Sequence, residues 1–218
     1  MNRRERKKSP IGATAALVLA AVSALVLLPL QAAAQQADPA SVIKQFNEAL
    51  LKSMKGGDRL GYRGRYELLA PVIRDSFALS YTARAAAGRY WATFSEEQRQ
   101  RYLKAYTDWT IATYAGRFDE YAGETFTIVS AAEPLRGTVT VVSRLGVPDK
   151  PGKDEVAFHY QLRKLEGGWR IADIRIEGVS QLALTRSQFV SILKKKGFEG
   201  LMETLRNRIE RLARGSGK

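Results

Sequence analysis

Residues 155–177 have the sequence EVAFHYQLRKLEGGWRIADIRIE, and this stretch decides the fold. From Glu155 to Lys164 apolar and polar residues alternate, which is typical of a β-strand with one buried face. Glu166-Gly167-Gly168 predicts a tight connection, and a second strand follows from Trp169 to Glu177. Strands joined by so short a connection pair antiparallel. The inward face of the first strand is expected to hold Val156, Phe158, Tyr160 and Leu162.

Two earlier stretches continue the same pattern. One strand is expected from about Glu124 to Ser130 and another from Thr138 to Leu145, with a turn at Pro134 and Gly137 between them. A loop at residues 148–152 then leads into the strand at Glu155. Together the four strands predict a curved antiparallel sheet that has one face buried and the other exposed.

Helical signals surround these strands. Ser95 and Gln98 form a capping box at the start of a helix that carries an aromatic stripe up to Tyr114. Asp38 is the expected N-cap of the first helix, with Pro39 at its first position. The order of helices, then strands, then helices indicates one α+β domain over residues 35–218. The other helices are expected at 38–55, 65–77, 82–87, 186–196 and 200–214.

The composition excludes several classes of protein. Hydrophobic residues make up 45% and charged residues 26% of the 218 residues, which is typical of a globular chain. The absence of cysteine excludes disulfides, thiolate metal sites and a cysteine nucleophile. A single histidine excludes a metal site built from several histidines of one chain.

The first 34 residues have the three parts of a secretory signal peptide. Five basic residues lie between Arg3 and Lys8, a largely apolar run follows from Ile11 to Leu30, and small residues end the segment. We expect cleavage after Ala34, with Ala37 as the second choice. The alternative is a retained membrane anchor, because the apolar run is long enough to span a bilayer.

The formal net charge is +13. Residues 1–34 carry five basic residues and one acidic residue, so their removal lowers the charge by four, to +9. For an exported protein this charge favours transient contact with an anionic membrane surface or an acidic protein face, and not with nucleic acid. A role in solubility alone is the alternative.

A curved sheet wrapped by helices can enclose an apolar pocket, which suits a lipid or a steroid-like ligand. The aromatic stripe and the inward strand faces would form its walls, although such a stripe is also typical of ordinary core. Ile174 has the opposite parity from Trp169 and Ile171, so its inward placement requires a bulge near Asp173. The candidate lining residues are Trp91, Tyr106, Trp109, Ile128, Val141, Tyr160, Ile174, Val179 and Phe189.

The sequence offers little for catalysis. Asp173 lies among apolar residues of its strand, where burial would suit it to general-base work. The alternative is that it accepts hydrogen bonds at the rim of the sheet. His159 falls on the polar face of its strand and is expected at the surface. No serine-nucleophile motif, phosphate-binding glycine loop or pair of metal carboxylates occurs.

The stretch Trp169–Ser180, WRIADIRIEGVS, resembles a signature of the toluene-tolerance family, which includes the MlaC-type periplasmic phospholipid-binding proteins. The segment Thr113–Glu124, TYAGRFDEYAGE, is more similar to HpnM, the hopanoid-associated branch. Two positions depart from the family pattern: Ala78 stands where an aspartate is frequent, and Thr185 where a tyrosine is common. Other matching residues are Leu68–Ile73, Gly88, Trp91, Ser95, Gln98, Arg99, Tyr114, Tyr121, Arg186–Phe189, Gly197, Leu201 and Leu205.

The resemblance implies a carrier that shuttles phospholipid or hopanoid between the inner and outer membranes, with an NTF2-like sheet and no cofactor. It also implies docking to membrane-anchored components of an ABC-transporter-linked complex. Burial of acyl methylenes, at about 0.8 kcal/mol each, would drive binding, so no enzymatic step is expected. Two alternatives stay open: an NTF2-like enzyme in which Asp173 or Tyr160 transfers a proton, and a non-catalytic adaptor.

The order of basic, apolar and small residues generates the first prediction. The mature protein should begin at Gln35 or Asp38 and be recovered in the periplasmic fraction, because signal peptidase cuts after small residues. N-terminal sequencing checks this. A membrane-bound product that still begins at Met1 would contradict it.

Overall fold

The computed structural model describes residues 38–132, 137–147 and 155–215. The expected signal peptide at 1–34, with its cleavage points at Ala34 and Ala37, lies outside these residues, as do Pro134 and the loop at 148–152. Within the described residues the order of elements is α1 (Pro39–Ser76), α2 (Leu79–Ala87), the 3-10 helix η1 (Gly88–Thr93), α3 (Glu96–Arg117), β1 (Thr125–Ala131), β2 (Thr138–Gly146), β3 (Val156–Leu165), β4 (Gly168–Ile176), β5 (Val179–Ser180) and α4 (Gln181–Ala213).

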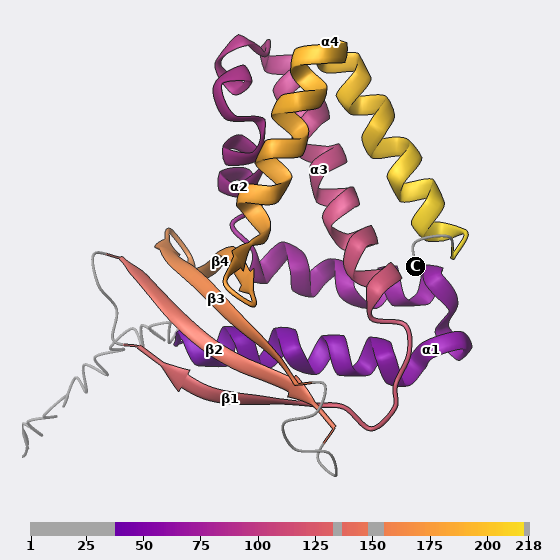
Figure 1. Ribbon diagram of the computed structural model, residues 1–218, viewed down its shortest axis with the longest axis vertical. Helices are drawn as coiled ribbons and strands as arrows, with labels where there is room; N and C mark the ends of the chain where they lie inside the picture. The colour runs from indigo at the N-terminus through magenta and orange to yellow at the C-terminus, as the bar shows by residue number, and fades with distance from the viewer. Residues whose placement is uncertain (1–37, 133–136, 148–154, 216–218) are drawn as a thin grey trace, which may run out of the picture. The chain divides into compact units, whose positions relative to one another are not determined.

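The expected α+β class is confirmed, with an open antiparallel sheet in the order β1-β2-β3-β4-β5 (Figure 1). The expectation of four strands needs one correction, since β5 adds a fifth. Glu177 and Gly178 have φ angles of 50° and 80° and turn the chain back, so that Val179 pairs with Ile176. Left-handed backbone of this kind is what a tight hairpin turn requires.

A bulge in β4 sets which side chains face the helices. Gln161 pairs with Asp173 and Leu162 pairs with Ile171, so Ala172 is the extra residue. One inserted residue exchanges the two faces of a strand. Ile171 and Ile174, which have opposite parity in the sequence, are therefore both buried on the same side of the sheet. The expected bulge near Asp173 is confirmed.

Helix α1 is longer than expected. Asp38 caps it through an Oδ1 that accepts from the backbone N–H of Ala40 at 2.8 Å, and Pro39 follows as predicted. The expected helices at 38–55 and 65–77 are its two arms, joined by non-helical backbone at Gly57 and Gly61, and Figure 1 shows the arms doubling back. Arg65 holds this bend, because its guanidinium donates to the carbonyls of Gly57 at 2.8 Å and Ala115 at 2.9 Å.

Two other helices follow their sequence signals closely. The capping box of α3 is confirmed, since the backbone N–H of Gln98 donates to Ser95 Oγ and the backbone N–H of Ser95 donates to Gln98 Oε1. Helix α4 joins the two helices expected at 186–196 and 200–214, with a kink at Gly197, whose φ is 66°. It begins at Gln181, five residues earlier than expected, because Ser180 Oγ accepts from the backbone N–H of Ala183 at 3.0 Å.

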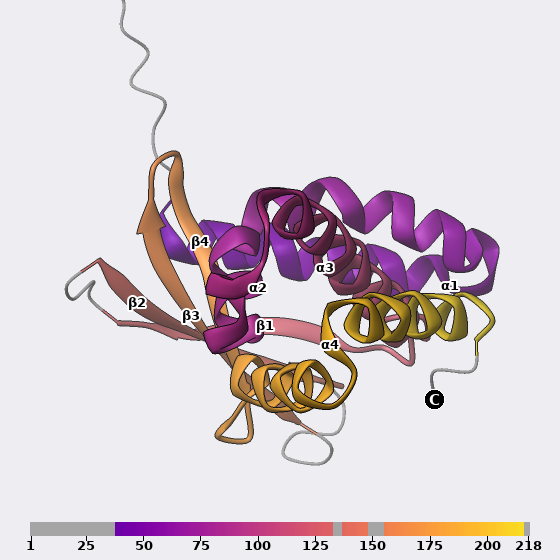
Figure 2. The same ribbon diagram turned by 90° about the horizontal axis from the view of Figure 1, so that it is seen from above.

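The buried residues form two clusters. The first lies between α1, α3 and the sheet, with Phe46, Ile73 and Tyr160 among its buried members. The second joins α2, η1, α3 and α4 around Tyr102 and Phe189. Both views show α3 and α4 side by side (Figures 1 and 2). Among the described helices, none combines the length and apolar character needed to cross a membrane.

Asp173 fastens the start of α4 to the sheet. One of its oxygens accepts from the backbone N–H groups of Ile174, at 2.8 Å, and Leu182, at 3.0 Å. The other accepts from Ser180 Oγ at 2.7 Å. Both oxygens of the carboxylate are thus used to fix the turn between β4 and α4.

We therefore predict that Asp173→Ala destabilises the protein by about 1–3 kcal/mol, because two half-buried amides lose their acceptor. Urea denaturation measures the loss. Asp75→Ala, at an exposed position of α1, is the control and should change the free energy of unfolding by less than about 0.5 kcal/mol. Equal stability of the two variants would contradict this role for Asp173.

Candidate functional site

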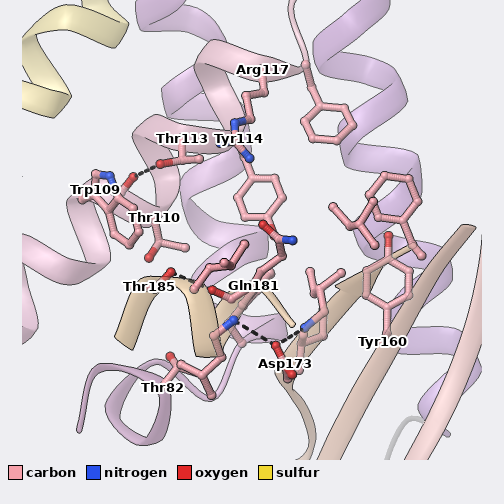
Figure 3. Close-up of a pocket in the computed structure, with 18 of the residues that line it drawn as sticks. Thr82, Trp109, Thr110, Thr113, Tyr114, Arg117, Tyr160, Asp173, Gln181 and Thr185 are labelled. Carbon is pink, nitrogen blue, oxygen red and sulfur yellow. Dashed lines mark hydrogen bonds between the residues drawn. The ribbon is translucent and has the colours of Figure 1, made fainter. Parts of the chain in front are cut away.

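A cavity of about 770 Å³ lies between α3, α4 and the buried face of the sheet. Its volume falls within the range of about 300–1,000 Å³ that is typical of small-molecule sites. Figure 3 shows how side chains from α3, β3, β4 and α4 converge on it. The sheet contributes Leu145, Phe158, Tyr160, Ile171, Ala172, Asp173, Ile174 and Ile176 to the lining.

An aromatic wall forms the side of the cavity next to α1. Phe46 is fully buried, and its ring centroid lies 5.2 Å from that of Phe77, 5.3 Å from that of Tyr114 and 6.1 Å from that of Tyr160. All three contacts are edge-to-face, the geometry that aromatic quadrupoles favour. Tyr160 also stacks on Phe158, with 6.0 Å between the centroids. These contacts fix α1, α3 and β3 to one another and keep the wall rigid.

The hydroxyl of Tyr160 is engaged in a buried hydrogen bond within the protein. It donates to Asn47 Oδ1 at 3.0 Å, and Asn47 Nδ2 donates to Ser143 Oγ at 3.0 Å. All three residues are buried. Burial raises the pKa of Tyr160, so the phenol stays protonated at neutral pH. This chain of hydrogen bonds ties α1 to the sheet behind the cavity wall.

Three threonines of α3 and α4 line the cavity, and the hydroxyl group of each is hydrogen-bonded within its own helix. Thr110 donates to the carbonyl of Tyr106, Thr113 to that of Trp109 and Thr185 to that of Gln181, each at 2.8 Å. Figure 3 shows the last two bonds. Because each hydroxyl is bonded one turn back along its own helix, an apolar ligand can cover these threonines without leaving a donor unpaired.

Two tyrosines of α3 add to the same surface. Burial raises the pKa of Tyr106 to about 12 and also raises the pKa of Tyr114. Both phenols are therefore neutral over the physiological range. The charged residues that line the cavity are Asp173 of β4, and Arg117, Arg208 and Arg211 near the C-terminal ends of α3 and α4.

The structure brings four of the nine expected lining residues together. Tyr106 and Trp109 reach the cavity from α3, Tyr160 from β3 and Ile174 from β4. In the sequence these residues lie at helical period on α3 and on the inward face of the strands.

The other five do not line this cavity. Val141 has the predicted inward parity, but it is fully buried in the cluster between α1 and the sheet. Ile128, on the edge strand β1, is half-buried against the same cluster. Val179 is 48% exposed, because it lies in β5 just beyond the hairpin turn.

Phe189 and Trp91 belong to the second cluster. Phe189 is fully buried behind the wall, with its centroid 5.3 Å from that of Trp109. Trp91 packs beside Phe94 and Tyr102 in the region of η1. Both residues pack against aromatic residues of α3 without lining the cavity.

Several lining residues were not predicted from the sequence. Tyr114 continues the aromatic stripe of α3, and Phe158 shares its strand face with Tyr160, so the pattern contained a signal for both. The sequence does not distinguish Phe46 from the other core residues of the first helix. It also contains no pattern that predicts Arg208 as a lining residue.

The cavity holds few groups suited to bond-making chemistry. Asp173 and Tyr160 are both engaged in the hydrogen bonds described above. His159 is exposed on the outer face of β3, as expected. In the described ranges, no group of three or more histidine or acidic side chains is placed to hold a metal ion.

Comparison with known proteins gives consistent matches. A family model described as "MlaC protein" matches residues 40–207. The chain is 27% identical over 126 residues to the "Intermembrane phospholipid transport system binding protein MlaC" of Haemophilus influenzae. That alignment covers 57% of this chain and 58% of the relative, so the chain spans less than two thirds of the relative's length.

A solved structure has the same fold. It is described as the phospholipid-binding protein from Ralstonia solanacearum in complex with a phospholipid. The match has a TM-score of 0.67 and 27% sequence identity, and it covers 81% of this chain and 99% of the other.

The role of Tyr160 can be tested directly. Tyr160→Phe should cost about 1–3 kcal/mol of stability, because Asn47 Oδ1 is left buried without its donor. Urea denaturation measures the loss, and Tyr81→Phe, at a residue that is 39% exposed, is the control. Unchanged stability in Tyr160→Phe would show that the buried hydrogen-bond chain is unimportant.

Proposed function

Because the chain belongs to the MlaC family, we propose that it is a carrier that binds a lipid in the cavity between α3, α4 and the sheet. The carrier moves lipid between the inner and outer membranes and performs no chemical step. The observation that supports this most strongly is a largely apolar cavity of about 770 Å³ in which the hydroxyls of Thr110, Thr113 and Thr185 are hydrogen-bonded within their own helices.

Binding is driven by removal of acyl chains from water. Each buried methylene contributes about 0.8 kcal/mol, so about ten methylenes contribute about 8 kcal/mol, which corresponds to a Kd of about 1 μM. The aromatic wall around Phe46 and Tyr114 offers a preformed surface for these chains. Because the threonine hydroxyls are bonded to their own helices, covering them costs little. The cavity therefore suits long hydrocarbon chains better than it suits a polar metabolite.

A glycerophospholipid is the cargo that the comparisons favour. The Haemophilus influenzae relative is named as a phospholipid transport system binding protein, and the Ralstonia solanacearum structure is described as a phospholipid-binding protein. Hopanoid, which the similarity to the HpnM branch suggests, is the second candidate cargo. The two are separated by mass spectrometry of an organic extract from the purified protein.

The proposed carrier works in the periplasm, after removal of residues 1–34. Its partners would be membrane-anchored components of an ABC-transporter-linked lipid-transport complex, together with transient contact to an anionic membrane surface. The net charge of +9 on the mature chain supports the second contact, because anionic lipids attract a basic protein across about one Debye length.

The geometry gives the enzyme alternative no support. A general base needs a lone pair that is free to accept a proton from the substrate. Asp173 accepts three hydrogen bonds that hold the start of α4, and the Tyr160 hydroxyl already donates its proton to Asn47 Oδ1 at 3.0 Å. A carrier requires neither group to react.

Filling the cavity tests the proposal. Thr113 and Thr185 line it from α3 and α4 (Figure 3), so Thr113→Trp/Thr185→Trp places two indole rings in the space for the ligand. This variant should fold but lose most of its co-purified lipid, as measured by mass spectrometry against the same amount of wild-type protein.

The matched control is Thr107→Trp/Ser187→Trp, which adds two tryptophans to the same helices at positions outside the cavity lining. It should keep its lipid. If the wild-type protein carries no lipid, or if both double variants keep it equally, the cavity is not the lipid site.

A further inference from the structure

Three arginines gather at one end of the cavity. Arg117 lies in the last turn of α3, Arg211 in the last turn of α4, and Arg208 one turn earlier in α4. All three line the cavity. The two helix ends are in close contact, because a Cβ placed on Gly116 would lie 2.8 Å from Leu212 Cδ2. Arg117 directly follows Gly116, and Arg211 directly precedes Leu212. Because Arg208 lies one turn before Arg211 in α4, all three arginines are at the same end of the cavity.

No carboxylate neutralises this group within the described part of the chain, where none of the three arginines forms an ion pair. The carboxylate in the cavity lining, that of Asp173, lies at the opposite end, with Tyr114 between it and Arg117 (Figure 3). Exposed arginines need no partner, but a cation that is half-buried in a cavity wall usually has one.

The position of Arg208 is the informative one. Arg117 and Arg211 stabilise the negative ends of their helix dipoles, which is a sufficient structural reason for a basic residue there. Arg208 is half-buried, and its guanidinium carbon lies 6.0 Å from the centre of the Phe189 ring. Burial, with the nearby charge of Arg211, lowers the pKa of Arg208. Arg211 already stabilises the end of α4, so helix stability does not explain why Arg208, a second cation, is half-buried beside it.

We propose that Arg117, Arg208 and Arg211 form an anion subsite that binds the phosphate of a lipid headgroup at this end of the cavity. Guanidinium groups match phosphate oxygens with paired, charge-assisted hydrogen bonds. The acyl chains then extend from this subsite along Tyr114 and the apolar lining toward the sheet. This inference rests on the proposed lipid-binding function and deepens it, because the subsite selects lipids that bear phosphate over lipids without an anionic group.

The test compares two lipids that differ only in the headgroup. Dihexanoylphosphatidylglycerol and dihexanoylglycerol are titrated into the delipidated protein by isothermal titration calorimetry, with inorganic phosphate as a third ligand. Arg208→Gln/Arg211→Gln should bind the phospholipid about tenfold more weakly than the wild type, since charge-assisted bonds to phosphate are lost. Its affinity for dihexanoylglycerol should not change. Arg211→Gln alone, at an exposed residue, repeats the comparison if the double variant does not fold.

The control is Lys195→Gln/Arg206→Gln, which removes the same charge from exposed positions of α4 outside the cavity. It should bind both lipids as the wild type does. An equal loss of both lipids in the arginine variant, or no loss of either, overturns the subsite while the carrier function stands. If the wild type binds inorganic phosphate through these arginines but neither lipid, the phosphate chemistry is supported and the lipid function fails. If it binds none of the three ligands, both are rejected.

Discussion

The extra residue in β4 is the constraint on which the rest of the cavity depends. With Ala172 bulged, Ile171 and Ile174 both face the helices, and Asp173 is left at the turn where it can hold the start of α4. On the edge of β4 that faces away from β3, the carbonyl of Ile171 accepts from the backbone N–H of Ala78 at 2.9 Å, which attaches the junction of α1 and α2. The junction of α1 and α2 and the start of α4 thus attach to the sheet within four residues of one strand, and α3 completes the wall of the cavity.

Local chemistry made much of this fold predictable. Strand parity on β3, the capping box at Ser95 and the N-cap at Asp38 are all properties of neighbouring residues, and the structure has each of them. The parity conflict at Ile174 even indicated the bulge. The two-arm form of α1 was not predicted as one element, because the bond from Arg65 to the Gly57 carbonyl depends on how the chain folds back.

The residues that line the cavity were harder to predict from the sequence than the fold was. Val141 and Tyr160 face the same side of the sheet, pair across adjacent strands and are both fully buried, yet of these two only Tyr160 also lines the cavity. The difference is which helix covers each part of the sheet, and strand alternation carries no information about that. Phe189 shows the same limit on a helix, since it lies one layer behind Trp109. Periodicity identifies the buried face of an element but not its distance from a cavity.

The strand order has a consequence for how quickly the chain can fold. Each strand pairs with its neighbour in sequence, so the sheet can form by successive hairpins with little loss of loop entropy. The contact that closes the structure is different, because the bond from Tyr160 to Asn47 joins residues 113 positions apart. The contacts of α1 with the sheet therefore form only after β3 has been synthesised, although α1 comes first and can already pack against α3. Until β3 is in place, the part of the apolar face of α1 that covers the sheet is exposed, which leaves the chain vulnerable to aggregation.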